Sequence, residues 1–270
     1  MDSGDRSKDA RLDAAYDALE DGDADGALAT ARNLLTEHAT DPDVLLLAGA
    51  AHAELGELEE SESHLRLAVA ADPHHPGSRS ALAELLFSTC RFTEAGAETA
   101  RLLDEAPDDP HGHDLASRLA ERRGDREKAA EEEREAHRLD PESFPLAPHL
   151  SRTEFDRCVE AALGELPDLF RARLTNLAIS VADVPADDVL HTLDDPTPDL
   201  LGLYVGIPLP ERQHTDLPGP PDTIFLFKRN LERMCTSRDE LVGEIRVTLL
   251  HEIGHFLGLD EEQIAEAGYD

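Results

Sequence analysis

The first half of the chain consists of short amphipathic segments that recur with a fixed period. Apolar residues stand at three- and four-residue steps in segments such as residues 44–55 and 58–70, which predicts consecutive helices. Four marks stand 34 residues apart: Gly22, Gly56, Cys90 and Gly124. Small residues follow these marks by five positions, and mostly prolines follow them by seventeen: Ala27, Ser61, Ala95 and Ala129, then Ala39, Pro73, Pro107 and Pro141. The period predicts four helix–turn–helix units that stack into one extended core.

The pattern changes after residues 142–148, a stretch with two prolines that is predicted to be a linker. Residues 154–170 have an apolar face at helical spacing. Three later segments alternate or are rich in β-prone residues and are predicted strands: residues 177–182, 200–207 and 223–227. A polar, proline-rich loop is expected at residues 211–221. Together these elements predict a small α+β domain.

The last predicted helix, which starts near residue 237, has signals at both ends. An apolar stripe runs along it: Leu241, Ile245, Leu249, Ile253 and Phe256. Ser237 followed by Glu240 predicts a capping box at its start. Gly258 is suited to the left-handed conformation that ends many helices. The chain is therefore expected to turn back at this glycine.

The same helix carries an H-E-x-x-H motif at residues 251–255. His251 and His255 are four residues apart, so they lie on one helical face and can bind one Zn²⁺ from the same side. Glu252, next to the first histidine, can act as a general base on water that the metal activates. This arrangement is typical of zinc hydrolases that split amide bonds.

A carboxylate just after Gly258 can complete the zinc site. The spacing favours Glu261 as the third ligand, and Asp260 is the nearer alternative. Three protein ligands with one open position form the geometry of a catalytic zinc site. The competing interpretation is a surface helix with two unoccupied histidines, followed by solvated acidic residues.

The chain is strongly acidic. It has 59 acidic and 25 basic residues among 270, for a formal net charge of −34 at pH 7. This charge argues against nucleic acid and anionic membrane surfaces as partners. Aromatic residues make up only 4% of the chain and tryptophan is absent, so the cores are expected to be mainly aliphatic.

The cysteines and the N-terminal segment bear on the compartment. Cys90, Cys158 and Cys235 form no C-x-x-C pair and show no spacing typical of a disulfide framework. Residues 1–8 are polar, and no apolar run approaches the length of a membrane span. We therefore expect a cytoplasmic protein with reduced thiols.

The 34-residue period between about residues 11 and 141 resembles the tetratricopeptide repeat. Cys90, Ser61 and Ala39 depart from the repeat's glycine, alanine and proline at single positions. The resemblance implies a helical solenoid whose concave surface binds a protein or peptide partner. Because the chain is acidic, a partner segment rich in Lys or Arg is expected. The alternative is an array that only packs on the second domain as a spacer.

The second half resembles the compact bacterial minimal-zincin metallopeptidase family, whose pattern is H-E-x-x-H-x-x-G-x-x-D. The resemblance spans about residues 154–269 and rests on three segments: residues 201–209, 224–227 and 249–255. It implies a small zincin fold that binds Zn²⁺ through His251 and His255, with Glu252 as the base. Glu261 stands in the place of the family's aspartate as third ligand.

These patterns predict a multidomain chain. An all-α tetratricopeptide-like helical solenoid is expected at residues 1–145, followed by a small α+β zincin-like domain at residues 146–270. The expected function is that of a zinc-dependent metallopeptidase whose repeats recruit a protein partner or substrate. Two alternatives stay open: a non-catalytic interaction scaffold with structural zinc, and a zinc hydrolase that acts on a non-peptide amide.

Several residues outside the motif are candidates for supporting roles. Tyr204, His214 and His191 are candidates for stabilising an oxyanion during hydrolysis. Residues 223–227 are expected to form either an edge strand that pairs with the substrate backbone or an ordinary interior strand.

Overall fold

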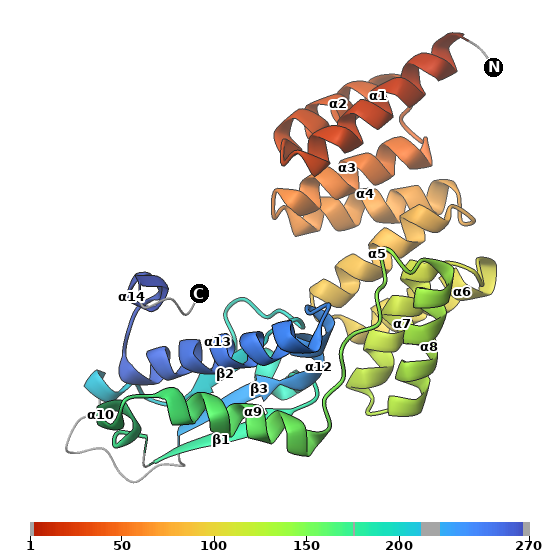
Figure 1. Ribbon diagram of the computed structural model, residues 1–270. Helices are drawn as coiled ribbons and strands as arrows, with labels where there is room; N and C mark the ends of the chain where they lie inside the picture. Colours follow the sequence, from red (N-terminus) through yellow and green to blue (C-terminus); the bar gives the residue numbers. More distant parts are fainter. Residues whose placement is uncertain (1–2, 175, 212–221, 267–270) are drawn as a thin grey trace. The chain divides into compact units, whose positions relative to one another are not determined.

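The structure is a computed structural model that describes residues 3–174, 176–211 and 222–266 (Figure 1). The chain divides into two compact units, Met1–Phe144 and Pro145–Asp270. The first unit is entirely helical in its described residues, and the second combines helices with a three-stranded sheet. The predicted fold class, a helical solenoid followed by a small α+β domain, is confirmed.

The first unit consists of helix pairs that follow one another along the chain (Figure 1). Its helices are α1 (Ser3–Glu20), α2 (Ala24–Glu37), α3 (Pro42–Glu54), α4 (Leu58–Ala71), α5 (Pro76–Ser88), α6 (Phe92–Glu105), α7 (Pro110–Arg122) and α8 (Arg126–Leu139). Each of these helices packs against the next. The buried apolar residues form two clusters, one from α1 to α3 and one from α4 to α7. Each inter-helix turn within a pair has a left-handed residue: Gly22 at φ +81°, Gly56 at +73°, Cys90 at +60° and Gly124 at +74°.

The repeated small residues lie at the contacts between the paired helices. They are almost fully inaccessible to solvent: Ala27, Ser61 and Ala95 at 0% exposure and Ala129 at 3%. A larger side chain at these positions would force the paired helices apart, because protein interiors are close-packed. The 34-residue period therefore has two physical causes: the left-handed turn and the close contact between the paired helices.

Cys90 is the exception at the left-handed turns, since a side chain with a Cβ is strained at positive φ. Replacing Cys90 with Gly is expected to raise the free energy of unfolding of the first unit by about 1 kcal/mol. Residue-resolved hydrogen exchange of the amides of α5 and α6 measures the change. Cys90→Ala is the matched control, because it removes the thiol and keeps the strained backbone. Equal stability of the Gly and Ala variants would contradict the prediction.

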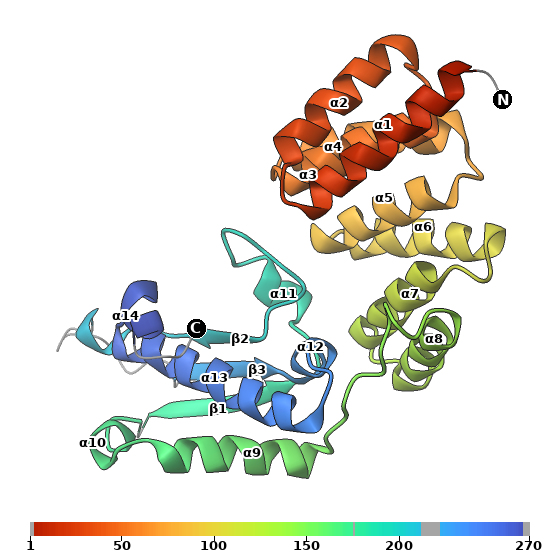
Figure 2. The same cartoon turned by 45° about the horizontal axis from the view of Figure 1, so that its top comes forward.

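The second unit contains one sheet and a small set of helices. Its elements are α9 (Arg152–Glu165), α10 (Asp168–Arg171), β1 (Leu177–Ala182), α11 (Asp187–Leu190), β2 (Gly202–Val205), η1 (Leu209–Glu211), β3 (Asp222–Phe227), α12 (Lys228–Arg233), α13 (Arg238–Leu257) and α14 (Glu261–Glu266). The strand order is β1-β3-β2, with β1 parallel and β2 antiparallel to β3. Helices α9 and α13 lie against one face of the sheet (Figures 1 and 2).

The core of this unit forms between that face and the two helices. The residues it buries come from the sheet and from both helices: Phe155 and Val159 on α9, Val181, Ile224 and Leu226 on the strands, and Leu241, Ile245 and Leu249 on α13. By the register of the strands, alternate residues of β1 and β3 point into this core. The sheet and α9 thus provide a rigid base for the long helix α13.

Three expectations about these elements need correction. Strand β3 is the central strand, so the edge-strand alternative for residues 223–227 is wrong and the interior-strand alternative holds. The helix expected over residues 154–170 ends at Glu165, because Leu166 precedes Pro167 and adopts an extended conformation. Strand β2 is shorter than the segment predicted at residues 200–207. Residues 212–221 of the expected loop lie outside the described residues.

A buried carboxylate ties the start of the second unit to α12. Glu232 has 0% exposure, and it accepts hydrogen bonds from the Leu150 N–H at 2.9 Å and from Arg229 Nη1 at 2.7 Å. Lys228 Nζ lies 2.6 Å away and His149 Nδ1 3.2 Å away. Burial alone would raise the pKa of Glu232, but the hydrogen bonds from Lys228, Leu150 and Arg229 outweigh it and hold this pKa below its usual range.

None of the helices within the described residues is long and apolar enough to cross a membrane.

Candidate metal centre

The long helix α13 begins at a cap that differs in one bond from the prediction. The Ser237 side chain accepts a hydrogen bond from the Glu240 N–H at 3.2 Å, as an N-cap residue does. The Glu240 carboxylate accepts from the Thr236 N–H at 2.7 Å and the Thr236 hydroxyl at 2.9 Å. The predicted helix start is confirmed. In a capping box the Glu240 side chain would accept from the Ser237 N–H, but here it accepts from Thr236 instead.

One face of α13 is anchored in the core. The apolar stripe predicted from the sequence is buried throughout, with Ile253 at 2% exposure and four residues at 0%: Leu241, Ile245, Leu249 and Phe256. Because the stripe fixes the rotation of the helix, His251 and His255 are directed away from the buried core, and both remain about one-third exposed. The helix thus presents two imidazoles one turn apart from a rigid support.

Gly258 ends α13 in the left-handed conformation, with φ +82°. A Cβ atom at this position would lie 2.6 Å from Cδ and Cγ of Pro210, so glycine is required for space as well as for conformation. The prediction that the chain turns at Gly258 is confirmed.

The turn leads into the short helix α14. Asp260 caps this helix: its Oδ1 accepts from the Gln263 N–H at 2.9 Å, and its own N–H donates to Gln263 Oε1 at 3.1 Å. Ile264, which is 1% exposed, packs on Gly254 of the motif, where a Cβ would lie 2.8 Å from Ile264 Cγ1. The cap and this contact set Glu261, the first residue of α14, opposite the two histidines.

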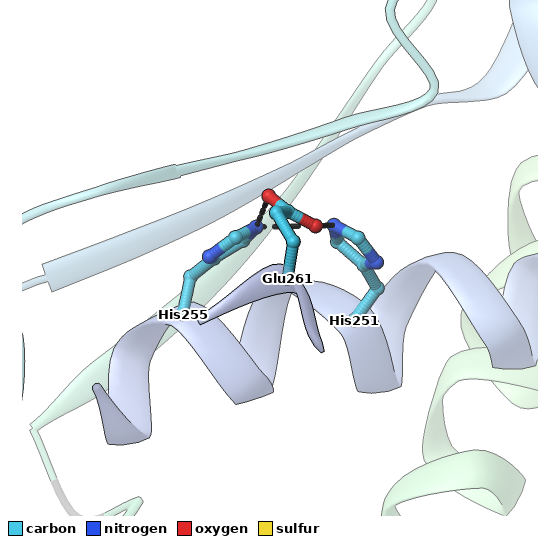
Figure 3. Close-up of side chains that lie close together, drawn as sticks. All are labelled: His251, His255 and Glu261. Carbon is cyan, nitrogen blue, oxygen red and sulfur yellow. Dashed lines mark hydrogen bonds and ion pairs between the residues drawn. The ribbon is translucent and has the colours of Figure 1, made fainter. Parts of the chain in front are cut away.

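The structure brings His251, His255 and Glu261 together (Figure 3). The two Nε2 atoms are 3.0 Å apart. Glu261 Oε1 lies 3.4 Å from His255 Nε2, and Glu261 Oε2 lies 3.7 Å from His251 Nε2. Among the described residues, this is the group of three or more His, Cys, Asp or Glu side chains whose ligand atoms lie within metal-binding reach of one another.

This donor set fits zinc. Tetrahedral ligands about 2.0–2.1 Å from Zn²⁺ lie roughly 3.3 Å from one another, and the three separations bracket that value. Two imidazoles and one carboxylate are a common set for catalytic zinc. Burial, helped by the charge of His251, lowers the pKa of His255, which favours the neutral imidazole that metals bind. The Glu261 side chain is 76% exposed, so the centre is open to solvent.

Glu252 follows His251 in α13 and is buried, at 7% exposure. Burial raises the pKa of Glu252 to about 7, although the charge of His251 and a hydrogen bond from the Tyr204 N–H oppose the shift. Just before β2, Leu201 O accepts from the Phe227 N–H, so the backbone groups of Gly202 and Tyr204 point to the outer edge of the sheet. The Tyr204 N–H therefore reaches Glu252 without disturbing the sheet.

Gly202 makes room for Glu252. A Cβ at this position would lie 2.9 Å from both Cγ and Oε1 of Glu252 and 2.8 Å from Cγ2 of Thr248. Glycine inside a strand often marks such a close approach, and this signal could have identified Gly202 from the sequence. Strand β2 and helix α13 can pack this closely only without a side chain between them.

Replacing Gly202 with Ala is expected to displace the Glu252 carboxylate and to cost about 1–3 kcal/mol in stability through overpacking. Zinc content should stay at the parent level, because the three candidate ligands lie on α13 and α14. Thermal unfolding and elemental analysis measure the two effects. Gly243→Ala is the matched control, since a Cβ there meets nothing within 4 Å. Equal unfolding temperatures for the two variants would contradict the expected clash.

The other candidates for supporting roles have separate places. The Tyr204 hydroxyl donates to Asp222 Oδ1 at 3.0 Å, so its contact with Glu252 is through the backbone. His191 is exposed at the end of α11. His214 lies outside the described residues. Asp222 was not singled out from the sequence, because an aspartate at a strand start has no distinctive spacing.

Two protein families match the chain. Residues 174–269 match the zincin-like metallopeptidase family, and residues 62–119 match the tetratricopeptide repeat. The chain thus combines an N-terminal tetratricopeptide-repeat region with a C-terminal zincin-like metallopeptidase domain, as the sequence predicted. No curated protein matches it.

Solved structures similar to this chain include tetratricopeptide-repeat proteins and MamA proteins. TTC0263, a tetratricopeptide-repeat protein of Thermus thermophilus, is 19% identical, with a TM-score of 0.46 over 50% of this chain and 75% of its own. YrrB, described as having an unusual peptide-binding site, is 18% identical, with a TM-score of 0.41 over 50% and 70%. MamA from Desulfovibrio magneticus RS-1 is 20% identical, with a TM-score of 0.42 over 50% and 76%.

Proposed function

We propose that the protein is a zinc-dependent metallopeptidase with its catalytic domain at residues 146–270 and a partner-binding repeat array at residues 1–145. The observation that carries this proposal is the convergence of His251, His255 and Glu261 next to a buried Glu252 on the same helix. In this assignment the first three residues hold the metal and Glu252 is the general base. Asp260 is used as the cap of α14, which favours Glu261 as the third ligand.

Zinc bound to these side chains would supply Lewis acidity, which makes water a stronger acid and polarises a scissile carbonyl. Glu252 takes the proton from the attacking water and passes it to the departing amine, so one carboxylate serves both steps. The Tyr204 N–H and the space left by Gly202 orient that carboxylate. His251 and His255 are each about one-third exposed, so their side chains are accessible to solvent.

A test of the site is the zinc content of the purified protein and of two variants. Nearly one zinc per chain is expected in the parent protein, with loss of the metal in His251→Ala. His191→Ala is the matched control, because this histidine is exposed in the same unit and lies outside the donor group. Failure of the parent to bind zinc after reconstitution would remove the hydrolase proposal and leave a non-catalytic interaction scaffold.

The third ligand is decided by a second pair of variants. Glu261→Ala is expected to weaken zinc binding by more than the roughly 10–100-fold that loss of a residue supporting a ligand costs, since it removes a direct oxygen donor. Asp260→Ala should affect zinc less, because this residue acts through the α14 cap. The reverse order of the two affinities would assign the ligand to Asp260.

For the repeat array we propose a partner segment rich in Lys or Arg. Helix α1 supports this with an exposed acidic row at four-residue spacing, Asp9, Asp13 and Asp17. An attraction between these charges and a basic peptide should weaken as salt shortens the Debye length. If the affinity for a lysine-rich peptide did not change with ionic strength, this partner chemistry would be contradicted.

A further inference from the structure

Besides Glu252 and Glu232, the second unit has a further buried carboxylate at the start of β3. Asp222 is 8% exposed. Its Oδ1 accepts hydrogen bonds from the Tyr204 hydroxyl at 3.0 Å and from the Ile207 N–H at 3.3 Å. One oxygen atom therefore holds both a side chain of β2 and the backbone just beyond the end of that strand.

Gly206, between these two donors, allows the close approach. A Cβ at Gly206 would collide with Asp222 Oδ1 and would lie 2.5 Å from the Tyr204 hydroxyl. The backbone at Gly206 therefore packs against Asp222 and Tyr204 so closely that no side chain fits there. We call this arrangement of Asp222, Tyr204, Gly206 and Ile207 the β2 clamp.

The β2 clamp is connected to the catalytic helix through Tyr204. The aromatic ring of Tyr204 packs edge-on against Phe256 of α13, with centroids 5.9 Å apart and an interplanar angle of 80°. Phe256 is fully buried and follows His255 directly. The backbone N–H of the same tyrosine donates to the Glu252 carboxylate. Tyr204 thus contacts Asp222 through its hydroxyl, Phe256 through its ring and Glu252 through its backbone.

We propose that Asp222 and Tyr204 are positioning residues for Glu252, which rests on the peptidase function proposed above. Asp222 fixes the hydroxyl of Tyr204 and the backbone at Ile207, and this holds the Tyr204 N–H in place at the outer edge of β2. The N–H in turn holds the Glu252 carboxylate toward the metal-binding side chains. Misplacement of a catalytic group by about 1 Å can lower a rate about 100-fold, so such a support has a measurable effect.

The test compares Asp222→Ala, Asp222→Asn and Tyr204→Phe in the full-length protein. Asp222→Ala is expected to lower kcat about 10–100-fold with KM and zinc content close to the parent values. Asp222→Asn keeps an oxygen acceptor at the same place and should restore most of the rate. Tyr204→Phe removes one hydroxyl, keeps the ring on Phe256, and should give an intermediate loss.

A second measurement, independent of catalysis, is amide hydrogen exchange by NMR in the metal-free protein. The Tyr204 amide should exchange at least about ten-fold faster in Asp222→Ala and detectably faster in Tyr204→Phe, with the amides of α13 unchanged. Unchanged exchange of the Tyr204 amide in both variants overturns the proposal, as does failure of Asp222→Asn to restore the parent behaviour. If the parent protein hydrolyses no peptide, the proposed function fails, and the exchange data still decide whether the β2 clamp positions Tyr204.

Discussion

Replacing Glu252 with Gln is expected to lower peptide hydrolysis by about 10²–10⁴-fold while leaving zinc bound. The amide is nearly the same size as the carboxylate, and it can still accept the Tyr204 hydrogen bond through its oxygen. It cannot take a proton from water, so the variant lacks the general base. The three proposed zinc ligands are unchanged. The measurement is single-turnover hydrolysis of a peptide library, with zinc content determined on the same samples.

The matched control for this variant is Glu262→Gln, which makes the same chemical change at an exposed position on α14. Its hydrolysis rate should stay within a factor of two or so of the parent rate, as for most surface changes. Equal rates in the Glu252 and Glu262 variants would show that any hydrolysis observed does not use Glu252, and would place the catalytic groups elsewhere.

The parts of this molecule that could be predicted from the sequence are those with local periodic causes. A left-handed turn and a close helix contact recur every 34 residues, so the repeats were visible even though Cys90 replaces glycine at one turn. The pair His251 and His255 was visible for a similar reason, since a four-residue spacing places two side chains on one helical face. The buried stripe of α13 and the turn at Gly258 follow from the same local rules.

The parts that were missed depend on contacts between distant segments. The order of the strands is set by pairing across long loops, and this left the edge or interior position of β3 open until the structure placed it in the centre. Gly202 and Glu252 are 50 residues apart in the sequence, and no spacing rule connects a strand glycine to a helix glutamate. The same holds for Asp222 and Tyr204, whose relation depends on the turn around Gly206.

The choice between Asp260 and Glu261 shows why spacing alone left the third ligand open. Both carboxylates follow the turn at Gly258, and either can be brought near a metal by a small change in the chain. The contact of Ile264 with Gly254 and the cap formed by Asp260 fix α14 in one orientation. These two features give adjacent acidic residues different environments.

Replacing Glu232 with Ala is expected to destabilise the second unit by about 3–5 kcal/mol. The substitution leaves Lys228, which is only 6% exposed, without its carboxylate partner, and it removes the acceptor of the Leu150 N–H. An uncompensated buried charge is far more costly than the loss of a surface ion pair. Since the chain has two units, a single unfolding free energy is not defined, and residue-resolved hydrogen exchange is the suitable measurement.

In that experiment the amides of α9 and α13 should exchange at least about 100-fold faster in Glu232→Ala, since 1.4 kcal/mol corresponds to a factor of ten. The amides of α1 to α8 provide an internal reference within the same sample. The control variant is Glu165→Ala, which removes an exposed ion pair between Glu165 Oε2 and Arg246 Nε, 2.7 Å apart. It should lower the stability of the second unit by at most about 1 kcal/mol. A similar change in exchange for the two variants would mean that the contacts of Glu232 stabilise the unit no more than a surface ion pair does, and the catalytic helix would then depend on its apolar stripe alone.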